Sequence, residues 1–379
     1  MKRTLGPSPL SIRTPPRLPL VTIFVLAIAL FLRLATLAFA QSSNNILPGP
    51  KPPDTPLEWK QLVGIYADEP KSIQPLVESK RSLVLLEQDG QLFLRDDQGK
   101  NQKIVVHDET VFLPSEGKKL FGHDIVRDEA EHIVAFCYLN FCFRRTDPGS
   151  DPSRSDRVTP SRPVATLRSE ALAATPPQET GNFRKPDLVE LGPLDRSIHL
   201  DIRYATSNDF LGAPVYSQAR AFLQRPAAEA LLRVQQKLKP LGYGLLIHDA
   251  YRPWYVTKIF WEATPPEGKI FVADPAQGSR HNRGCAVDLT LFDLASGKPI
   301  EMPGTYDEMS PRSFPDYPGG TSLQRWHRDL LRRAMESEGF TVYEAEWWHF
   351  DYKDWKEYPI LNVPFEKLGL DSGAVAVHD

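Results

Sequence analysis

Residues 146–182 divide the chain into two segments with different sequence patterns. This stretch is rich in Pro, Ser, Thr, Asp and Arg and contains few large apolar residues. A segment of that composition cannot bury enough apolar surface to offset the conformational entropy lost on ordering it. It therefore predicts a disordered linker. A chain of 379 residues is long enough for two domains, and we expect one domain on each side of the linker.

Residues 57–145 show short apolar runs of the kind that form β-strands. Asp89-Gly90 stands between two of these runs, and this dipeptide is a strong signal for a two-residue hairpin turn. The runs comprise residues 83–86, 92–94, 104–106, 111–113 and 133–136. We expect a small antiparallel all-β domain, either a sheet or a barrel. The histidines of this segment lack the spacing of metal ligands, so we expect no metal site in it.

Residues 183–371 mix helical and strand patterns. A helix is expected at 226–238, and a second one at 323–338, where Gly339 is suited to end it. Strands are expected at residues 245–247, 286–291 and 340–350, which are rich in apolar, aromatic and β-branched side chains. Helices and strands in this arrangement indicate an α+β domain.

The first 40 residues are typical of a secretory signal peptide. Basic residues precede an apolar run at 18–32, and Ala38-Phe39-Ala40 is a small-x-small cleavage site. Residues 41–56 then form a Pro-rich spacer. The alternative is an uncleaved membrane anchor, although Arg33 would place a charge in the spanning helix. In either case we expect the rest of the chain to be exported, to the periplasm or the extracellular space.

Cys137 and Cys142 bracket four residues of an apolar stretch. If Leu139-Asn140 forms a two-residue turn, the cysteines face each other at a non-hydrogen-bonded position of a hairpin. The Cα atoms then approach to about 4.5 Å, which is within the range of a disulfide. The alternative is two small apolar residues in a strand. Cys285 is the remaining cysteine, and we expect it to be a buried thiol.

Four side chains of the C-terminal segment carry the donors of a metal site. They are His281, Asp288, Glu346 and His349. Two imidazoles and one carboxylate leave one position of a tetrahedral zinc ion open for water, which is the ligand count of a catalytic zinc site. The second carboxylate is then spare. A surface pair is the alternative interpretation of His281 and Asp288 alone.

The spacing of Glu346 and His349 has a structural consequence. Residues three apart point to opposite faces of a regular strand, whereas Trp347, Trp348 and Phe350 favour extended structure. We therefore expect a bulge or a bend, and bulges often lie at active sites. Trp347 and Trp348 would then line the site and exclude water from it. The alternative is a core strand with an unrelated Glu-His pair.

The order of these residues resembles the zinc D-alanyl-D-alanine dipeptidase family. The resemblance rests on Ser279-x-His281-x-x-Gly284-x-Ala286-x-Asp288 followed by Glu346-x-Trp348-His349, and on the segments 204–206, 208–210 and 249–253 in the same order. It covers about residues 185–365. It implies an α+β zinc peptidase domain. The small antiparallel all-β domain that precedes it is not part of the family's minimal pattern.

The resemblance also implies roles for single residues. His281, Asp288 and His349 match the ligands of one Zn²⁺ per chain. Glu346 matches the general base and acid. Arg252 matches the residue that stabilises the oxyanion, which is a suitable role for a side chain that does not lose its proton at working pH. A structural salt bridge is the alternative role of Arg252.

Three further residues match positions that bind the substrate. Ser279 and Tyr204 match positions that help to seat it, and Asp307 matches one that binds its free amino group. The expected reaction is hydrolysis of the D-alanyl-D-alanine dipeptide. A D,D- or L,D-carboxypeptidase acting on peptidoglycan stem peptides is the alternative within the same chemistry. A non-catalytic cell-wall binding protein with a structural zinc is the alternative of another class, and Glu346 argues against it because binding alone needs no general base.

The charge of the chain argues against a nucleic-acid partner. The formal net charge is -3, and no basic block stands out beyond the N-terminus, whereas nucleic-acid-binding domains carry clustered Lys and Arg. We expect contact with a membrane only if the N-terminal segment stays uncleaved.

Overall fold

The computed structural model describes residues 46–68, 82–114, 120–138, 141–147 and 157–369. The described residues from Ile46 onward belong to one compact unit. The predicted signal peptide at 1–40 lies outside the described residues, and so does the first part of the predicted spacer at 41–56. In the described part of the chain, no helix combines the length and the apolar character that a membrane span requires.

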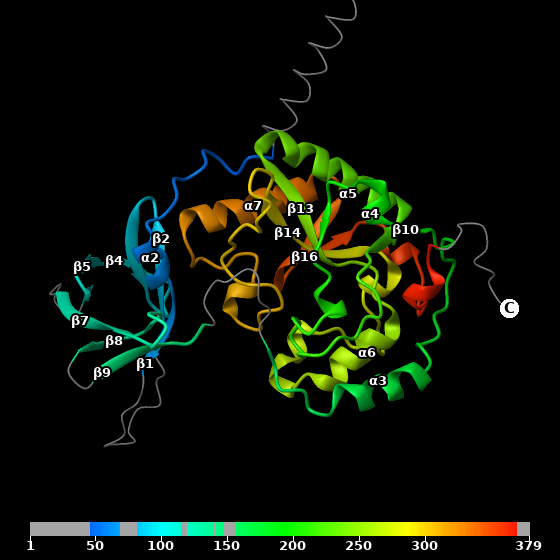
Figure 1. The fold of residues 1–379 in the computed structure, drawn as a ribbon, viewed down its shortest axis with the longest axis horizontal. Helices are drawn as coiled ribbons and strands as arrows, with labels where there is room; N and C mark the ends of the chain where they lie inside the picture. Colours follow the sequence, from blue (N-terminus) through cyan, green and yellow to red (C-terminus); the bar gives the residue numbers. More distant parts are fainter. Residues whose placement is uncertain (1–45, 69–81, 115–119, 139–140, 148–156, 370–379) are drawn as a thin grey trace, which may run out of the picture. The chain divides into compact units, whose positions relative to one another are not determined.

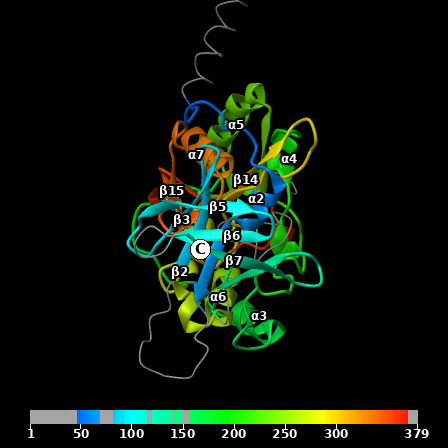
Figure 2. The same cartoon turned by 90° about the vertical axis from the view of Figure 1, so that its left-hand side faces the viewer.

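The predicted all-β domain is a single antiparallel sheet, to which we refer, with the residues that flank it at 57–147, as the β domain. Its first element is the short helix α2 (Leu57–Leu62). The strands are β1 (Gly64–Asp68), β2 (Ser82–Gln88), β3 (Gln91–Arg95), β4 (Asn101–Lys103), β5 (Val105–His107), β6 (Thr110–Pro114), β7 (Leu120–Arg127), β8 (Ile133–Tyr138) and β9 (Phe141–Arg145). Their order in the sheet is β4-β3-β2-β1-β9-β8-β7-β6-β5. The edge strands β4 and β5 are separated by Ile104 alone, so the sheet must curl until its two edges meet (Figure 2).

The hairpin predicted at Asp89-Gly90 is present between β2 and β3. Gln88 pairs with Gln91, and both turn residues have positive φ, 52° for Asp89 and 73° for Gly90. A type I′ turn requires positive φ at both central positions, which explains why this dipeptide is a reliable hairpin signal.

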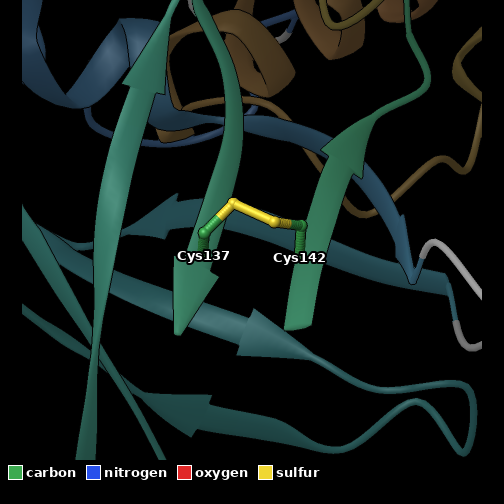
Figure 3. The surroundings of a disulfide bond; sticks show 2 residues. All are labelled: Cys137 and Cys142. Carbon is green, nitrogen blue, oxygen red and sulfur yellow. A yellow bond between two sulfur atoms is a disulfide. The ribbon is translucent and has the colours of Figure 1, made fainter. Parts of the chain in front are cut away.

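The structure contains the disulfide between Cys137 and Cys142 (Figure 3). The two cysteines are direct cross-strand partners on β8 and β9, and their Cα atoms are 4.2 Å apart. The neighbouring pair Tyr138–Phe141 is in the same register, and Leu139-Asn140, where a turn was predicted, lies outside the described residues. The bridge therefore joins adjacent strands of the β domain. Cys285 is a buried free thiol, as expected.

The C-terminal segment forms an α+β domain around a five-stranded sheet. We call residues 184–368 the peptidase domain. Its strands are β11 (His199–Leu200), β13 (Tyr243–Asp249), β14 (Ala286–Asp293), β15 (Phe340–Tyr343) and β16 (Glu346–Tyr352), in the order β11-β13-β14-β16-β15. Only β11 and β13 pair in parallel. A separate two-stranded sheet joins β10 (Leu188–Glu190) to β12 (Phe222–Gln224).

Helices α5 (Arg225–Leu238) and α7 (Ser322–Glu336) pack on this sheet and on each other (Figure 1). Both were predicted, and α7 is followed by Gly339 with φ of 86°. A full capping box starts α7, because Thr321 and Gln324 each accept a hydrogen bond from the other's backbone N–H. The remaining helices are α4 (Leu191–Leu194) and α6 (Trp254–Ala263), with short 3₁₀ turns between the elements.

The structure corrects the prediction of a disordered linker at 146–182 for the residues it describes, whereas residues 148–156 lie outside the described residues. Residues 164–173 form the helix α3 (Val164–Ala173), which packs against α6, with Leu167 and Ala171 fully buried in the core. The overall composition of the stretch did not predict this helix, because a few apolar side chains at helical spacing are enough to pack a helix against its neighbour.

The structure also corrects the single strand expected at 340–350. The chain folds back at Glu344-Ala345, so that β15 and β16 form an antiparallel hairpin at the edge of the sheet. Aromatic and β-branched residues continue through both strands and the turn, and the pattern alone contained no break.

Candidate active site

One cavity of about 450 Å³ brings all eight predicted site residues together. Its walls come from the loop after β13, the segment 269–283, β14, the loop at 307–309 and β16. The predicted residues that line it are Tyr204, Arg252, Ser279, His281, Asp288, Asp307, Glu346 and His349. A cavity of this size is within the range of small-molecule sites. The geometry supports one common site, and the individual roles remain predictions.

The sheet places three of the polar residues in one row. Asp249 on β13 pairs directly with Asp288 on β14, and Asp288 pairs with His349 on β16. Directly paired residues project from the same face of a sheet. The alternate residues of β14, Val287 and Leu289, point to the other face and are fully buried in the apolar core. The strand ladder thus fixes the spacing of the row.

Three donor atoms converge as a metal-binding group. His281 Nε2 lies 3.0 Å from His349 Nδ1 and 3.2 Å from Asp288 Oδ1, and His349 Nδ1 lies 3.1 Å from the same oxygen. All three residues are buried. Ligands about 2.0 Å from a tetrahedral zinc ion lie about 3.3 Å from one another. Asp288 Oδ1 is buried and has no hydrogen bond among the described residues. The donor set and its spacing fit zinc.

The outer nitrogens of both imidazoles are held by acceptors. His281 Nδ1 lies 2.6 Å from the carbonyl oxygen of Ala250, and His349 Nε2 lies 2.9 Å from Asp351 Oδ1. An acceptor at the outer nitrogen fixes its proton there and turns the inner lone pair toward the metal. Burial lowers the pKa of His349, but Asp351 and Asp288 outweigh this and raise it to about 10. The carboxylates of Asp288 and Asp351 therefore favour a positive charge beside His349.

The predicted bulge brings Glu346 to the same site as His349. On β15, Val342 and Tyr343 are consecutive, yet their partners on β16 are Phe350 and Glu346. Three residues of β16 are thus looped out of register. Glu346 Oε2 lies 3.7 Å from His349 Nδ1. Burial raises the pKa of Glu346 to about 7, although His349 acts to lower it. A carboxyl group with such a pKa can both take up and release a proton near neutral pH.

The site contains a permanent cation, Arg252, beside the metal-binding group. Its Nη2 lies 2.8 Å from Asp249 Oδ2 and 3.7 Å from Asp288 Oδ2. Burial lowers the pKa of Arg252, but Asp249 and the neighbouring groups outweigh this and hold it well above the usual value. The salt bridge that was the alternative role is therefore present, and it orients a guanidinium that also lines the cavity.

Ser279 contributes to the turn that presents His281. Its hydroxyl oxygen accepts a hydrogen bond from the backbone N–H of His281 at 3.2 Å, and Asn282 Oδ1 accepts one from the N–H of Ser279 at 2.7 Å. The turn closes at Gly284, whose φ is 67°. The local sequence therefore forms a tight 3₁₀ turn that leads directly into β14.

Asp307 lies partly buried in the cavity wall, and its carboxyl group has a vacant acceptor. Tyr204 donates a hydrogen bond to its Oδ1 at 3.0 Å, whereas its Oδ2 is buried without a partner among the described residues. Burial raises the pKa of Asp307 well above its usual value, and the charge of Asp288 adds to this. A cationic group in the cavity would relieve both the desolvation and the missing hydrogen bond.

The structure corrects one prediction about the walls. Trp348 lines the cavity, but Trp347 lies in a small separate cavity with His248 and Tyr306. Neighbouring residues of a strand point to opposite faces, so the two indoles could not share one wall.

Three positioning groups were not predicted. Asp249 holds Arg252, Asp351 holds His349, and the Tyr306 hydroxyl donates to Asp288 Oδ2 at 3.1 Å. Asp351 carried a usable signal, because residues two apart on a strand share a face. Tyr306 carried none, since it is remote from its partner in sequence.

Comparison with known proteins places residues 184–366 in a family described as D-ala-D-ala dipeptidase. The chain is 34% identical over 179 residues to the D-alanyl-D-alanine dipeptidase of Escherichia coli K12, a match that covers 47% of this chain and 91% of that protein. It is 35% identical over 187 residues to the D-alanyl-D-alanine dipeptidase of Enterococcus faecalis V583, covering 44% and 92%. The enzyme of that name from Streptomyces coelicolor is 33% identical over 193 residues, covering 46% and 93%.

Proposed function

Because the chain belongs to the D-alanyl-D-alanine dipeptidase family, we propose that it hydrolyses the D-alanyl-D-alanine dipeptide in a zinc-dependent reaction. The observation that carries this proposal is the convergence of the metal-binding group, Glu346, Arg252 and Asp307 on one cavity. Each of these groups meets a separate requirement of hydrolysis of a dipeptide with a free amino group.

The residues present fit one zinc ion, held by His281, Asp288 and His349. When bound, the metal would lower the pKa of a coordinated water toward about 7 and polarise the scissile carbonyl group. Ala250 and Asp351 keep the two imidazoles in the tautomers that ligation requires.

Glu346 is the proposed general base and acid. Its pKa of about 7 lets it take a proton from the attacking water and deliver that proton to the leaving amine. Arg252 stays protonated and is fixed by Asp249, so it can stabilise the negative charge that develops on the carbonyl oxygen. Buried surroundings strengthen both effects, because charges interact more strongly at low dielectric.

Asp307 is the proposed site for the ammonium group of the substrate. Its Oδ2 has no partner among the described residues, and Tyr204 holds the other oxygen in place. An ammonium group would donate a charge-assisted hydrogen bond to this oxygen. Recognition of a free amino group distinguishes a dipeptidase from enzymes that act inside longer peptides.

The test is a steady-state assay of the purified chain with D-Ala-D-Ala and N-acetyl-D-Ala-D-Ala, with a muropeptide as third substrate. We expect kcat/KM to be highest for the free dipeptide. If the N-acetylated substrate or the muropeptide is hydrolysed as well as the free dipeptide, the amino-group site does not exist and the proposed substrate is wrong.

A D,D- or L,D-carboxypeptidase is the second candidate, and the size of the cavity favours it. About 450 Å³ is room for a ligand larger than a dipeptide, and residues 269–274 also line the cavity. A peptidoglycan stem peptide could use this room. The same zinc chemistry serves both candidates, and the muropeptide arm of the assay separates them.

A non-catalytic wall-binding protein with a structural zinc has less support. Structural zinc sites are closed by four protein ligands, whereas the group found in the described residues has three. Glu346, partly buried beside it and with a pKa of about 7, has no function in a purely structural site.

We also propose that the chain is exported to the periplasm or the extracellular space. The disulfide between Cys137 and Cys142 supports this, because disulfides persist in oxidising compartments. The signal-like sequence of residues 1–40 supports it as well. Detection of the chain in a periplasmic or secreted fraction, with its N-terminus at Gln41, would test both points.

A further inference from the structure

The loop that carries Asp307 is tied to the β domain by a buried carboxylate. Asp147 lies two residues after the end of β9, the last strand of the β domain, and its side chain is fully buried. Its Oδ1 accepts hydrogen bonds from Arg145 Nη1 at 3.0 Å and from Arg312 Nη1 at 2.7 Å. Arg145 belongs to β9, whereas Arg312 belongs to the peptidase domain. One carboxylate of the β domain therefore joins a guanidinium from each domain.

Arg312 in turn holds the loop at 303–313, which we call the Asp307 loop. Its Nε donates to the carbonyl oxygen of Pro303 at 2.9 Å and lies 3.4 Å from Glu308 Oε1. Glu308 is fully buried, and its Oε2 accepts from the backbone N–H of Thr305 at 2.9 Å. These bonds connect the two ends of the loop across its base. Arg145, Asp147, Arg312 and Glu308 form a chain of alternating charges that ends beside Asp307.

Asp307 depends on this support because of its backbone. Its φ is 61°, in the left-handed region that few residues other than Gly, Asn and Asp adopt. Such a conformation persists only where the surrounding structure imposes it. The loop is also closely packed, since a Cβ atom on Gly304 would lie 2.6 Å from the carbonyl oxygen of Arg312. The bonds of Glu308 and Arg312 brace the loop on both sides of Asp307.

A second carboxylate of the β domain holds the far end of the same region. Glu87 on β2 is buried, and its Oε2 accepts the backbone N–H of Ser322 at 2.7 Å, at the start of α7. A negative charge is favourable at a helix N-terminus. Arg325 Nη2 donates to the carbonyl oxygen of Glu87 at 2.8 Å, and Leu86 forms a β-bridge with Gly320. The stretch from the Asp307 loop to α7 is thus fastened to the β domain at both ends.

We propose that the β domain is a positioning element of the active site, in which Asp147 and Glu87 hold the Asp307 loop in the conformation that receives the substrate ammonium group. The inference rests on the proposed function, in which Asp307 binds that group. Asp147 is a positioning residue rather than a catalytic one, because it acts through Arg312 and Glu308. The family match at 184–366 does not include the β domain, so the relatives' names carry no information about this role.

The test uses Asp147→Asn in the full chain, with D-Ala-D-Ala and N-acetyl-D-Ala-D-Ala as substrates. We expect KM for the free dipeptide to rise by about 10-fold, less than the loss on removing the Asp307 carboxylate itself, because displacing a positioned group by about 1 Å costs up to the order of 100-fold. We expect kcat, and the low activity on the N-acetylated substrate, to change little. A residue that only stabilises the fold would lower the active fraction and leave KM unchanged.

A double-mutant cycle with Asp307→Asn shows whether Asp147 acts through Asp307. In the Asp307→Asn background, Asp147→Asn should have no further effect on kcat/KM, because coupled residues are not additive. Equal effects in both backgrounds would overturn the inference. Glu301→Gln is the matched control. It removes a half-exposed carboxylate that lies 3.4 Å from Lys60 at the same junction, and we expect wild-type parameters.

If Asp147→Asn does not fold, Glu87→Gln tests whether the β domain positions the Asp307 loop. Glutamine keeps an acceptor for Ser322, so a folded protein with a smaller rise of KM is expected. Unchanged KM in this variant would overturn the inference in that case.

Hydrogen exchange separates this inference from the proposed function. Backbone amides of residues 303–313 should exchange faster in Asp147→Asn than in the wild type, while those of β14 and β16 should not change. Unchanged exchange in the loop overturns the inference whatever the substrate. Failure of the wild type to prefer the free dipeptide overturns the proposed function whatever the exchange rates.

Discussion

The two halves of the site are built in different ways. His281, Asp288 and His349 lie on or directly before the central strands of the peptidase domain, and the sheet ladder pairs Asp288 with His349. Asp307 lies on a loop with positive φ, outside any regular element. The metal-binding group is thus positioned by backbone pairing, whereas the proposed amino-group site at Asp307 is positioned by a chain of side-chain ion pairs that reaches into the β domain.

This difference means that the residues proposed for the chemical step and the residue proposed for substrate recognition are positioned independently. Backbone ladders are made by every sequence that forms the strands, so a change of one side chain leaves their geometry intact. Ion pairs between buried side chains are lost with a single substitution, and the partner that remains is then buried without compensation. We expect damage to the metal-binding half to affect all substrates alike. Damage to the loop half should change the choice between substrates.

Removal of the metal should have the largest effect. Three buried donors with no fourth protein ligand in the described group fit a zinc ion with one position open for water, which the proposed reaction requires. Treatment with a strong chelator should abolish hydrolysis of the free and the N-acetylated dipeptide alike, and one equivalent of Zn²⁺ should restore it. Elemental analysis should find one zinc per chain. Full activity in protein shown to be metal-free would contradict the zinc mechanism and the role given to the metal-binding half of the site.

Glu346→Gln should have the next largest effect. General acid–base groups typically contribute about 10²- to 10⁴-fold, and glutamine cannot take up the proton. We expect kcat to fall by that amount for both substrates, with zinc content unchanged. Loss of zinc from the variant would instead make Glu346 a ligand. Glu344→Gln is a suitable control, because Glu344 lies in the turn before β16 and does not line the cavity.

The metal-binding half could largely be predicted from the sequence. His281, Asp288, Glu346 and His349 lie in two short motifs, and the strand period alone required a bulge between Glu346 and His349. Local patterns of this kind survive in a single sequence because the residues concerned are close together in it.

The loop half could not be predicted in the same way. Asp147 and Arg312 are 165 residues apart, and no periodicity links a residue at a strand end to one in an irregular loop. Helix α3 was missed for a related reason, because its burial depends on α6 rather than on the composition around it. Partners that are distant in sequence follow from the tertiary fold, which a local pattern does not contain.

Asp307→Asn should have a smaller and more selective effect than Glu346→Gln. Removing one partner of a desolvated charge pair costs at least about 2 kcal/mol, or roughly 30-fold in kcat/KM. We expect this loss for D-Ala-D-Ala, because its ammonium group would lose the charged acceptor. N-acetyl-D-Ala-D-Ala has no ammonium group and should be little affected. An equal loss with both substrates would contradict the separation of recognition from chemistry.

Asp351→Asn should have the smallest effect on hydrolysis of the four changes. It tests the metal-binding half of the site through a residue that holds a metal ligand but is not one itself. Asp351 accepts a hydrogen bond from His349 Nε2 at 2.9 Å, and it lies two residues further along the same strand. Loss of such a partner typically weakens metal binding by about 10- to 100-fold. The asparagine oxygen can still accept the proton of Nε2, but without the negative charge that makes the imidazole a better donor. We expect Zn²⁺ to be released at lower chelator concentration.

In Asp351→Asn, the ratio of kcat/KM for the free dipeptide to kcat/KM for the N-acetylated dipeptide, measured with saturating zinc, should equal the ratio in the wild type. Asp354→Asn removes a carboxylate that pairs with Arg184 at the surface nearby, and it should leave zinc affinity unchanged. A change in the substrate ratio in Asp351→Asn would mean that the two halves of the site are coupled, and the sheet would then position the Asp307 loop as well as the metal.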